Sequence, residues 1–192
     1  MNIVTKLAAA LFLGVVSSAA MAEQGAYALA DLGVSSYGGG YSAPLGIRIG
    51  GGYNFIEPVK NLTIGAEGAF GYFGEATSTI FNVTTKVKTQ GVMVSGVVNY
   101  AIPNVSALSV VGKLGFMIAN TSYSYTNVTF PAASYSGSGS SSGLFFGVGM
   151  QYDINKNIGI RAMYEDFGSA ANTSATASAG LTRLSAGAVF KF

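Results

Sequence analysis

The chain has 192 residues, of which 49% are hydrophobic and only 9% charged, and its formal net charge is +2. An ordinary soluble domain is ~25% charged, and a nucleic-acid-binding domain presents a strongly basic face, so nucleic acid is not expected as a partner. The sequence contains no cysteine and no histidine. These absences exclude a disulfide framework and remove the commonest metal ligand and general base. We therefore expect no metal, no cofactor and no enzymatic activity.

Residues 1–22 have the three parts of a secretory signal peptide. Lys6 supplies the positive charge, residues 7–16 form the apolar core, and Ala20-Met21-Ala22 matches a small-x-small cleavage site. The apolar stretch is shorter than the ~20 residues that a spanning helix needs, which disfavours the alternative of a retained membrane anchor. The sequence predicts a signal peptide at 1–22 and one β-barrel domain at 23–192.

Beyond the signal peptide, apolar residues recur at every second position and never form another long uninterrupted run. A period of two is typical of β-strands. A chain that is apolar overall but distributes its apolar residues by alternation is typical of a transmembrane β-barrel. Alternation predicts eight strands, at 25–34, 43–56, 62–74, 86–101, 107–120, 143–154, 158–168 and 179–192.

The connections between these segments are of two kinds. Three short turns, at 57–61, 102–106 and 155–157, contain the Pro and Asn that tight reversals favour. Four longer connections are rich in Ser, Thr, Asn, Gly and Tyr, and they lie at 35–42, 75–85, 121–142 and 169–178. Short and long connections alternate, as they do in outer-membrane barrels. The predicted fold class is all-β, an eight-stranded antiparallel up-and-down transmembrane β-barrel.

Each predicted strand has one bulky apolar face and one face of small and charged residues. In segment 158–168, for example, Ile158, Ile160, Ala162 and Tyr164 oppose Gly159, Arg161, Met163 and Glu165. The second face has too many glycines and too few charges to form a soluble surface. We therefore expect the bulky face to contact lipid and the other face to line the lumen. The alternative is a soluble, lipocalin-like carrier with its bulky face inside.

Three segments carry a resemblance to a known family: Tyr27–Gly33, Gly159–Glu165 and the closing Phe190-Lys191-Phe192. In these, the chain resembles the small, porin-like outer-membrane β-barrel family typified by outer-membrane proteins A and X. The resemblance implies the outer membrane of a Gram-negative bacterium, with its lipid and lipopolysaccharide as surroundings. It also implies that the barrel-assembly machinery recognises the terminal aromatic residue, Phe192, as an assembly signal. We expect a monomer.

Seven charged residues are predicted to lie on the lumen face at similar depth: Asp31, Arg48, Glu67, Lys113, Arg161, Glu165 and Arg183. An eight-stranded barrel is just wide enough for its own side chains, and buried charges persist only when they are paired. We therefore predict an ionic network that largely plugs the lumen. Asp153 and Lys191 are predicted nearer the periplasmic mouth.

The alternative to a plugged lumen is a narrow, low-conductance pore for ions or small solutes. It depends on the inward-facing glycines, which would leave space inside the barrel. These are Gly46, Gly50, Gly52, Gly65, Gly71, Gly147, Gly149 and Gly187.

Specific recognition by such a barrel belongs to its outer loops, here 35–42, 75–85, 121–142 and 169–178. The longest contains Tyr123, Tyr125, Phe130 and Tyr135 among Ser, Thr and Asn, a composition suited to adaptable binding. A hydrophilic cap that only screens the barrel is the alternative. The predicted function is a structural or surface-interaction role in adhesion or envelope integrity, with host or surface ligands contacting these loops.

Overall fold

The structure is a computed structural model that describes residues 25–38, 40–80, 83–105, 107–127, 129, 134–168 and 180–192. The predicted signal peptide, 1–22, lies outside the described residues, and so does the predicted loop 169–178. Eight strands follow one another: β1 (Ala26–Ser36), β2 (Leu45–Val59), β3 (Leu62–Ile80), β4 (Val83–Ala101), β5 (Leu108–Asn127), β6 (Tyr135–Asp153), β7 (Ile158–Asp166) and β8 (Thr182–Lys191). Within the described ranges, no helix has the length and apolar character needed to cross a membrane.

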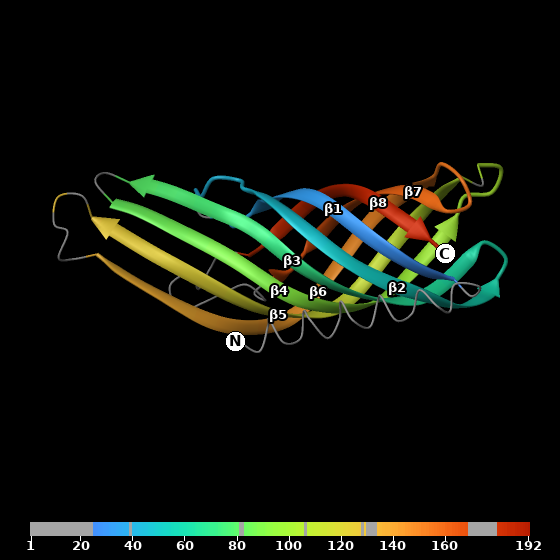
Figure 1. Ribbon diagram of the computed structural model, residues 1–192, viewed down its shortest axis with the longest axis horizontal. Helices are drawn as coiled ribbons and strands as arrows, with labels where there is room; N and C mark the ends of the chain where they lie inside the picture. The colour runs from blue at the N-terminus through green and yellow to red at the C-terminus, as the bar shows by residue number, and fades with distance from the viewer. Residues whose placement is uncertain are drawn as a thin grey trace.

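Every strand pairs antiparallel with its neighbours in the sequence, and β1 pairs with β8, so the sheet closes into a barrel (Figure 1). The closing register places Tyr27 opposite Lys191. The amide of Phe192 extends this pairing by donating to the carbonyl of Ala26 at 3.1 Å. The predicted eight-stranded up-and-down barrel is therefore confirmed.

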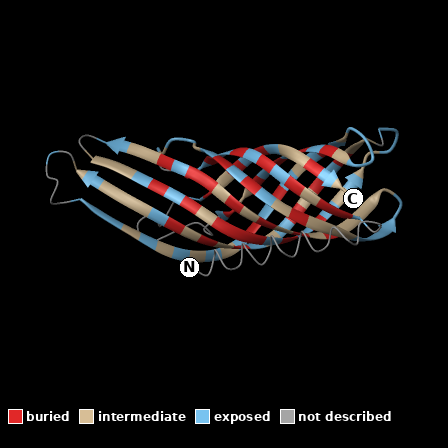
Figure 2. Ribbon diagram, in the orientation of Figure 1, coloured by how far each residue is buried: buried red, intermediate tan, exposed pale blue. Residues whose placement is uncertain are grey.

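Burial alternates along the strands, with buried and exposed residues following each other around the barrel (Figure 2). The exposed face carries large apolar side chains such as Leu114, Leu144 and Leu184, which are 65%, 72% and 64% exposed. The opposite face carries the buried charged residues Asp31, Arg48, Glu67, Lys113, Arg161, Glu165 and Arg183. In water, each Å² of this apolar surface would carry a free-energy cost of ~25 cal/mol. The exterior is therefore suited to hydrocarbon, and the soluble-carrier alternative is wrong.

Four strands are longer than predicted. Segment 75–85 was expected to be a loop, but β3 and β4 continue through it and leave only residues 81–82 between them. Segment 121–142 likewise belongs mostly to β5 and β6, with 128–134 as their connection. The Ser and Thr side chains of these segments indicated loops. Polar side chains require contact with water, but they do not prevent the backbone from pairing, and Thr, Val and Tyr favour strands. The result is a sheet of β3–β6 that projects beyond the other four strands (Figure 1).

The predicted turn 57–61 is also shorter than expected, because β2 continues to Val59 and only Lys60 and Asn61 reverse the chain. Asn61 adopts the left-handed conformation, with φ of 71°, which Asn tolerates in tight turns. Pro58 fits within the strand because the β2–β3 register is irregular between Ile56 and Val59. A proline is accepted in a sheet where the hydrogen-bond ladder is already interrupted.

A β-bulge marks the point where β3 leaves the closed barrel. Tyr72 pairs with Gln90, but the next aligned pair is Glu75 with Lys88, so two residues of β3 oppose one of β4. Gly74 occupies the bulge with φ of 86°. Beyond the bulge, Ser42 covers the free edge of β3, since its amide donates to the carbonyl of Thr77 and its hydroxyl accepts from the Thr77 amide, both at 2.9 Å.

Candidate functional site: the closed lumen and the projecting sheet

Arg48 forms the centre of the half of the ionic network that lies nearer the projecting sheet. Its Nη1 donates to both oxygens of Glu165, at 2.5 and 2.6 Å, and its Nε donates to Asp31 Oδ2 at 2.7 Å. The other oxygen of Asp31 forms an ion pair with Arg183 Nη2 at 2.7 Å. All four side chains are almost completely buried. The four strands that carry them, β1, β2, β7 and β8, are thereby cross-linked inside the barrel.

Glu67 forms the centre of the other half, which lies nearer the end of the barrel where the chain terminates. Lys113 Nζ donates to Glu67 Oε1, Arg161 Nη1 donates to Oε2 at 2.7 Å, and the Tyr27 hydroxyl donates to Oε2 at 3.0 Å. Lys113 also lies 4.0 Å from Glu165, which joins this half to the Arg48 half. The Arg161 guanidinium stands 5.3 Å from the centre of the Tyr27 ring.

Further hydrogen bonds carry the network toward the end where the chain terminates. Arg161 Nε donates to Gln151 Oε1 at 2.9 Å, and Gln151 Nε2 donates to Asp153 Oδ1 at 2.8 Å. Lys191 Nζ closes the series on Asp153 Oδ2 at 2.6 Å. This last pair is partly exposed, as its predicted position near the periplasmic mouth requires.

An apolar cluster fills the lumen beyond Arg183, toward the projecting sheet. It includes Phe73, Phe145 and Phe167, with ring centres 5.0 to 5.1 Å apart along the series. The Arg183 guanidinium lies 5.8 Å from the centre of the Phe73 ring, so the cluster rests directly on the network. Burial raises the pKa of the Tyr37 phenol at the edge of this cluster to about 12, which keeps its hydroxyl protonated.

The interior glycines do not leave the open space that the pore alternative needs. At each of the eight predicted positions, an added Cβ would come within 3.0 Å of a neighbouring atom. The ring of Tyr27 occupies the space at Gly52, and Glu165 Cγ would lie 2.8 Å from a Cβ at Gly147. Neighbouring side chains take the volume at Gly52, Gly71 and Gly147, and at the other five positions the nearest atom belongs to the backbone of the adjacent strand.

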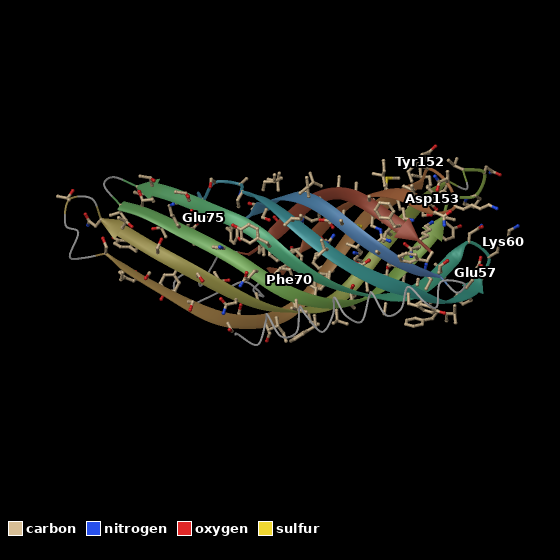
Figure 3. The ribbon with its side chains drawn as sticks, in the orientation of Figure 1. Glu57, Lys60, Phe70, Glu75, Tyr152 and Asp153 are labelled. Carbon is tan, nitrogen blue, oxygen red and sulfur yellow. The ribbon has the colours of Figure 1, made fainter. Side chains whose placement is uncertain are left out.

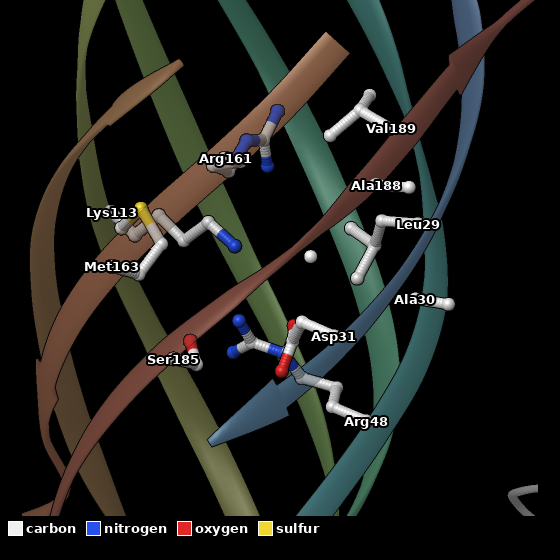
Figure 4. Close-up of a pocket in the computed structure, with 11 residues that line it drawn as sticks. Leu29, Ala30, Asp31, Arg48, Lys113, Arg161, Met163, Ser185, Ala188 and Val189 are labelled. Carbon is white, nitrogen blue, oxygen red and sulfur yellow. The ribbon is translucent and has the colours of Figure 1, made fainter. Parts of the chain in front are cut away.

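A void of about 10 Å³ lies within the network. Figure 4 shows Lys113 and Arg161 extending from one side toward the space where Asp31 and Arg48 meet. This is close to the smallest volume that accepts a water molecule. The described part of the lumen is therefore packed. Polar groups contact one another in its middle, and apolar groups fill the part nearer the projecting sheet.

The projecting sheet carries a cluster of tyrosines, Tyr123, Tyr125 and Tyr135, on its lumen side. Tyr125 stacks on Tyr135 with ring centres 5.1 Å apart, and Tyr123 meets Tyr135 edge to face at 6.3 Å. Tyr135 is 57% exposed. We call these three residues the tyrosine cluster. Phe130, the fourth aromatic predicted for this region, lies outside the described residues.

The structure brings together all seven residues that the sequence predicted for the network, and it adds Tyr27 and Gln151, which were missed as members. Both could have been found from the two-residue period of a strand, because Tyr27 is in the same alternation as Asp31 on β1, and Gln151 is in that of Gly147 and Gly149 on β6. Phe73 was also within reach, because it continues the inward alternation of Glu67 and Gly71 on β3. Among the described residues, no group of His, Cys, Asp and Glu is arranged to hold a metal.

An apolar exterior, a closed ring of eight strands and a charged, filled interior define a small transmembrane β-barrel of the outer membrane. The family comparison agrees. Residues 7–192 match the model of the outer membrane protein beta-barrel domain, and the chain belongs to this family. The predicted resemblance and the location in the outer membrane are confirmed.

Solved structures show the same fold at low identity. Ail of Yersinia pestis, crystallised with the heparin analogue sucrose octasulfate, is 20% identical over 88% of this chain and 99% of its own, with a TM-score of 0.56. Neisserial surface protein A is 18% identical over 87% and 97%, with a TM-score of 0.53. OprG of Pseudomonas aeruginosa is 11% identical over 88% and 97%, with a TM-score of 0.52. No curated protein matches the sequence.

Proposed function

We propose that this protein is a plugged outer-membrane barrel whose projecting sheet makes contacts at the cell surface, in adhesion or envelope integrity. The observation that carries the proposal is the continuation of β3–β6 beyond the apolar exterior as a polar sheet with the tyrosine cluster. Tyrosine offers a large, stiff surface with a hydroxyl, and serine offers adaptable hydrogen bonds, a combination that suits recognition. The Ail structure contains a heparin analogue, which makes a sugar a reasonable first ligand to test.

The packed lumen supports the barrel as a scaffold more than as a conduit. Arg48, Glu67 and their partners span its middle, and Phe73, Phe145 and Phe167 fill it above. A void of about 10 Å³ does not favour the narrow-pore alternative. Planar-bilayer recordings of the purified protein should accordingly show no steady conductance, whereas reproducible unitary currents would favour the pore.

The surface-contact proposal is tested by replacing the stacked pair Tyr125 and Tyr135. Cells displaying the Tyr125→Ser/Tyr135→Ser variant should adhere less to glycan-coated or host-cell surfaces than cells displaying the unaltered protein. The matched control is Thr84→Ala/Thr126→Ala, a pair that is aligned across β4 and β5 on the opposite face of the same sheet. Equal adhesion by all three would mean that the sheet only screens the barrel.

Deleting residues 126–141 would test the adhesion role less cleanly than the tyrosine substitutions do. The deletion would remove paired residues of β5 and β6, including Asn127 and Tyr135, and so perturb the sheet itself. Two tyrosine substitutions leave the backbone ladder in place.

A further inference from the structure

The outward face of the barrel changes character abruptly along β4. Val98 and Val94 are exposed on this face and belong to the apolar exterior. The next position of this alternation is Val92, which is buried, and the positions beyond it toward the projecting end are Gln90, Lys88 and Lys86. The same change occurs on β5, where the apolar series through Phe116 gives way to Ser122 and Ser124. The boundary marks where hydrocarbon ends and the headgroup layer begins.

A groove of about 470 Å³ lies on the outward face just beyond this boundary. Strand register aligns its residues in rows, since Glu75 pairs with Lys88, Lys88 with Ser122, and Ser122 with Ser138. Figure 3 labels Glu75 on β3, on the far side of Phe70 from Glu57 near the end of β2 and Lys60 in the turn that follows. The groove is lined by Glu75, Lys86, Lys88, Ser122, Tyr123, Ser124, Ser136, Gly137 and Ser138.

The groove has an excess positive charge. Lys86 Nζ pairs with Glu75 Oε1 at 3.0 Å, and both side chains are about half exposed. Within the described ranges, Lys88 has no carboxylate at ion-pair distance, and its ammonium lies 5.3 Å from the centre of the Tyr72 ring. Tyr72 is the last outward aromatic of β3 before the bulge. Lys88 is therefore a cation held at the edge of the apolar exterior, where anionic headgroups gather.

We propose that this groove, which we call the Lys86/Lys88 groove, binds the phosphorylated sugar headgroup of a glycolipid in the outer leaflet. Lys88 and Lys86 would contact phosphate, and the serine hydroxyls would bond the sugar. A membrane lipid fits better than a soluble sugar because Lys88 lies over the outward ring of Tyr72, at the end of the apolar exterior. Acyl chains that lie against the apolar exterior would already place their headgroup beside the groove. Tyr123 of the tyrosine cluster also lines the groove. The surface-contact variant replaces only Tyr125 and Tyr135, so the two proposals can fail independently.

The test uses the full-length barrel in detergent micelles and fluorescently labelled lipopolysaccharide, with binding followed by anisotropy. The variant Lys86→Gln/Lys88→Gln should bind about thirtyfold more weakly, because each of the two lysines contributes about 1 kcal/mol near an anionic surface. The matched control, Lys60→Gln/Lys156→Gln, removes the same charge at the turns of the opposite end and should bind like the unaltered protein. Folding of each variant is checked by its gel mobility before and after heating.

Two further probes separate the chemistry and the source of the ligand. Lipopolysaccharide treated with phosphatase should bind the unaltered protein as weakly as untreated lipopolysaccharide binds Lys86→Gln/Lys88→Gln. Equal binding of both forms, or an equal loss in both double variants, would overturn the proposal. A soluble heparin fragment that displaces the label more effectively than lipopolysaccharide itself would also overturn it, and would assign the groove to an external sulfated glycan.

Discussion

Arg48 of β2 and Glu165 of β7 meet across the lumen, and one guanidinium nitrogen contacts both carboxylate oxygens at 2.5 and 2.6 Å. Around the closed sheet, two strands separate them in one direction and four in the other. The pair therefore ties distant parts of the ring together where no backbone hydrogen bond can. Both side chains are almost fully buried, so each depends on the other for its compensation.

A double-mutant cycle should measure this dependence. We expect Arg48→Gln and Glu165→Gln to show a coupling of about 1–3 kcal/mol in the free energy of unfolding, as groups within one network do. The control cycle, Lys86→Gln with Glu75→Gln, concerns a half-exposed pair and should give less than about 1 kcal/mol. Equal coupling in the two cycles would contradict a buried network. Urea titration of the barrel in lipid vesicles provides the free energies.

Glu67→Ala should be strongly destabilising. It leaves Lys113 and Arg161 buried without their shared carboxylate, and removing one partner of a buried pair costs about 3–5 kcal/mol. Glu75→Ala, on the same strand but on the outward face, should cost less than about 1 kcal/mol. The temperature at which the folded band disappears on a gel compares the variants, and an unchanged temperature for Glu67→Ala would refute the network.

Leu114→Arg should cost about 2–4 kcal/mol, since it places a charge on the lipid face near the middle of the apolar exterior. Ser124→Arg lies on the same face of the same strand but beyond the boundary, and we expect it to change stability by less than about 0.5 kcal/mol. The measurement is unfolding in bilayers of fixed composition. Similar costs at the two positions would mean that the boundary is misplaced.

Gly74→Ala should destabilise the bulge by about 1–3 kcal/mol, because the position combines a φ of 86° with close contact to Pro44. At Gly112, an added Cβ meets nothing within 4 Å and the backbone is ordinary. Gly112→Ala should therefore be tolerated within about 0.5 kcal/mol. Hydrogen exchange of β3 beyond Tyr72 should rise in Gly74→Ala alone, and uniform exchange would count against the bulge as the origin of the projection.

Phe192→Ala should slow insertion into the outer membrane if the terminal aromatic is the assembly signal that the family resemblance implies. Phe190→Ala is the control, since Phe190 is equally exposed, at 48%, on the same strand end. The readout is the fraction of newly made protein that shows the folded gel mobility. Equal delay in both variants would point to lost lipid contact instead of a lost signal.

The fold and most of the network could be predicted from the sequence because the side-chain period of a strand is two. One set of positions, including Asp31, Arg161 and Glu165, had to share a face, and the apolar bulk of the opposite face indicated where lipid lies. Closure of the ring was predicted from the same pattern. Tyr27 and Gln151 were within reach of that reasoning, since their parity places them on the inner face.

Only the tertiary structure decided how the inner side chains pair and where the barrel ends. Whether Arg48 meets Glu165 or Glu67 depends on strand stagger, which alternation does not specify. Polarity in 75–85 and 121–142 indicated departure from lipid, but not departure from the sheet, because hydrogen bonding between strands is independent of what their side chains contact. The bulge at Gly74 reverses the inward and outward alternation of β3 beyond it, so the outward row from Glu75 through Lys88 to Ser138 exists only in the folded register.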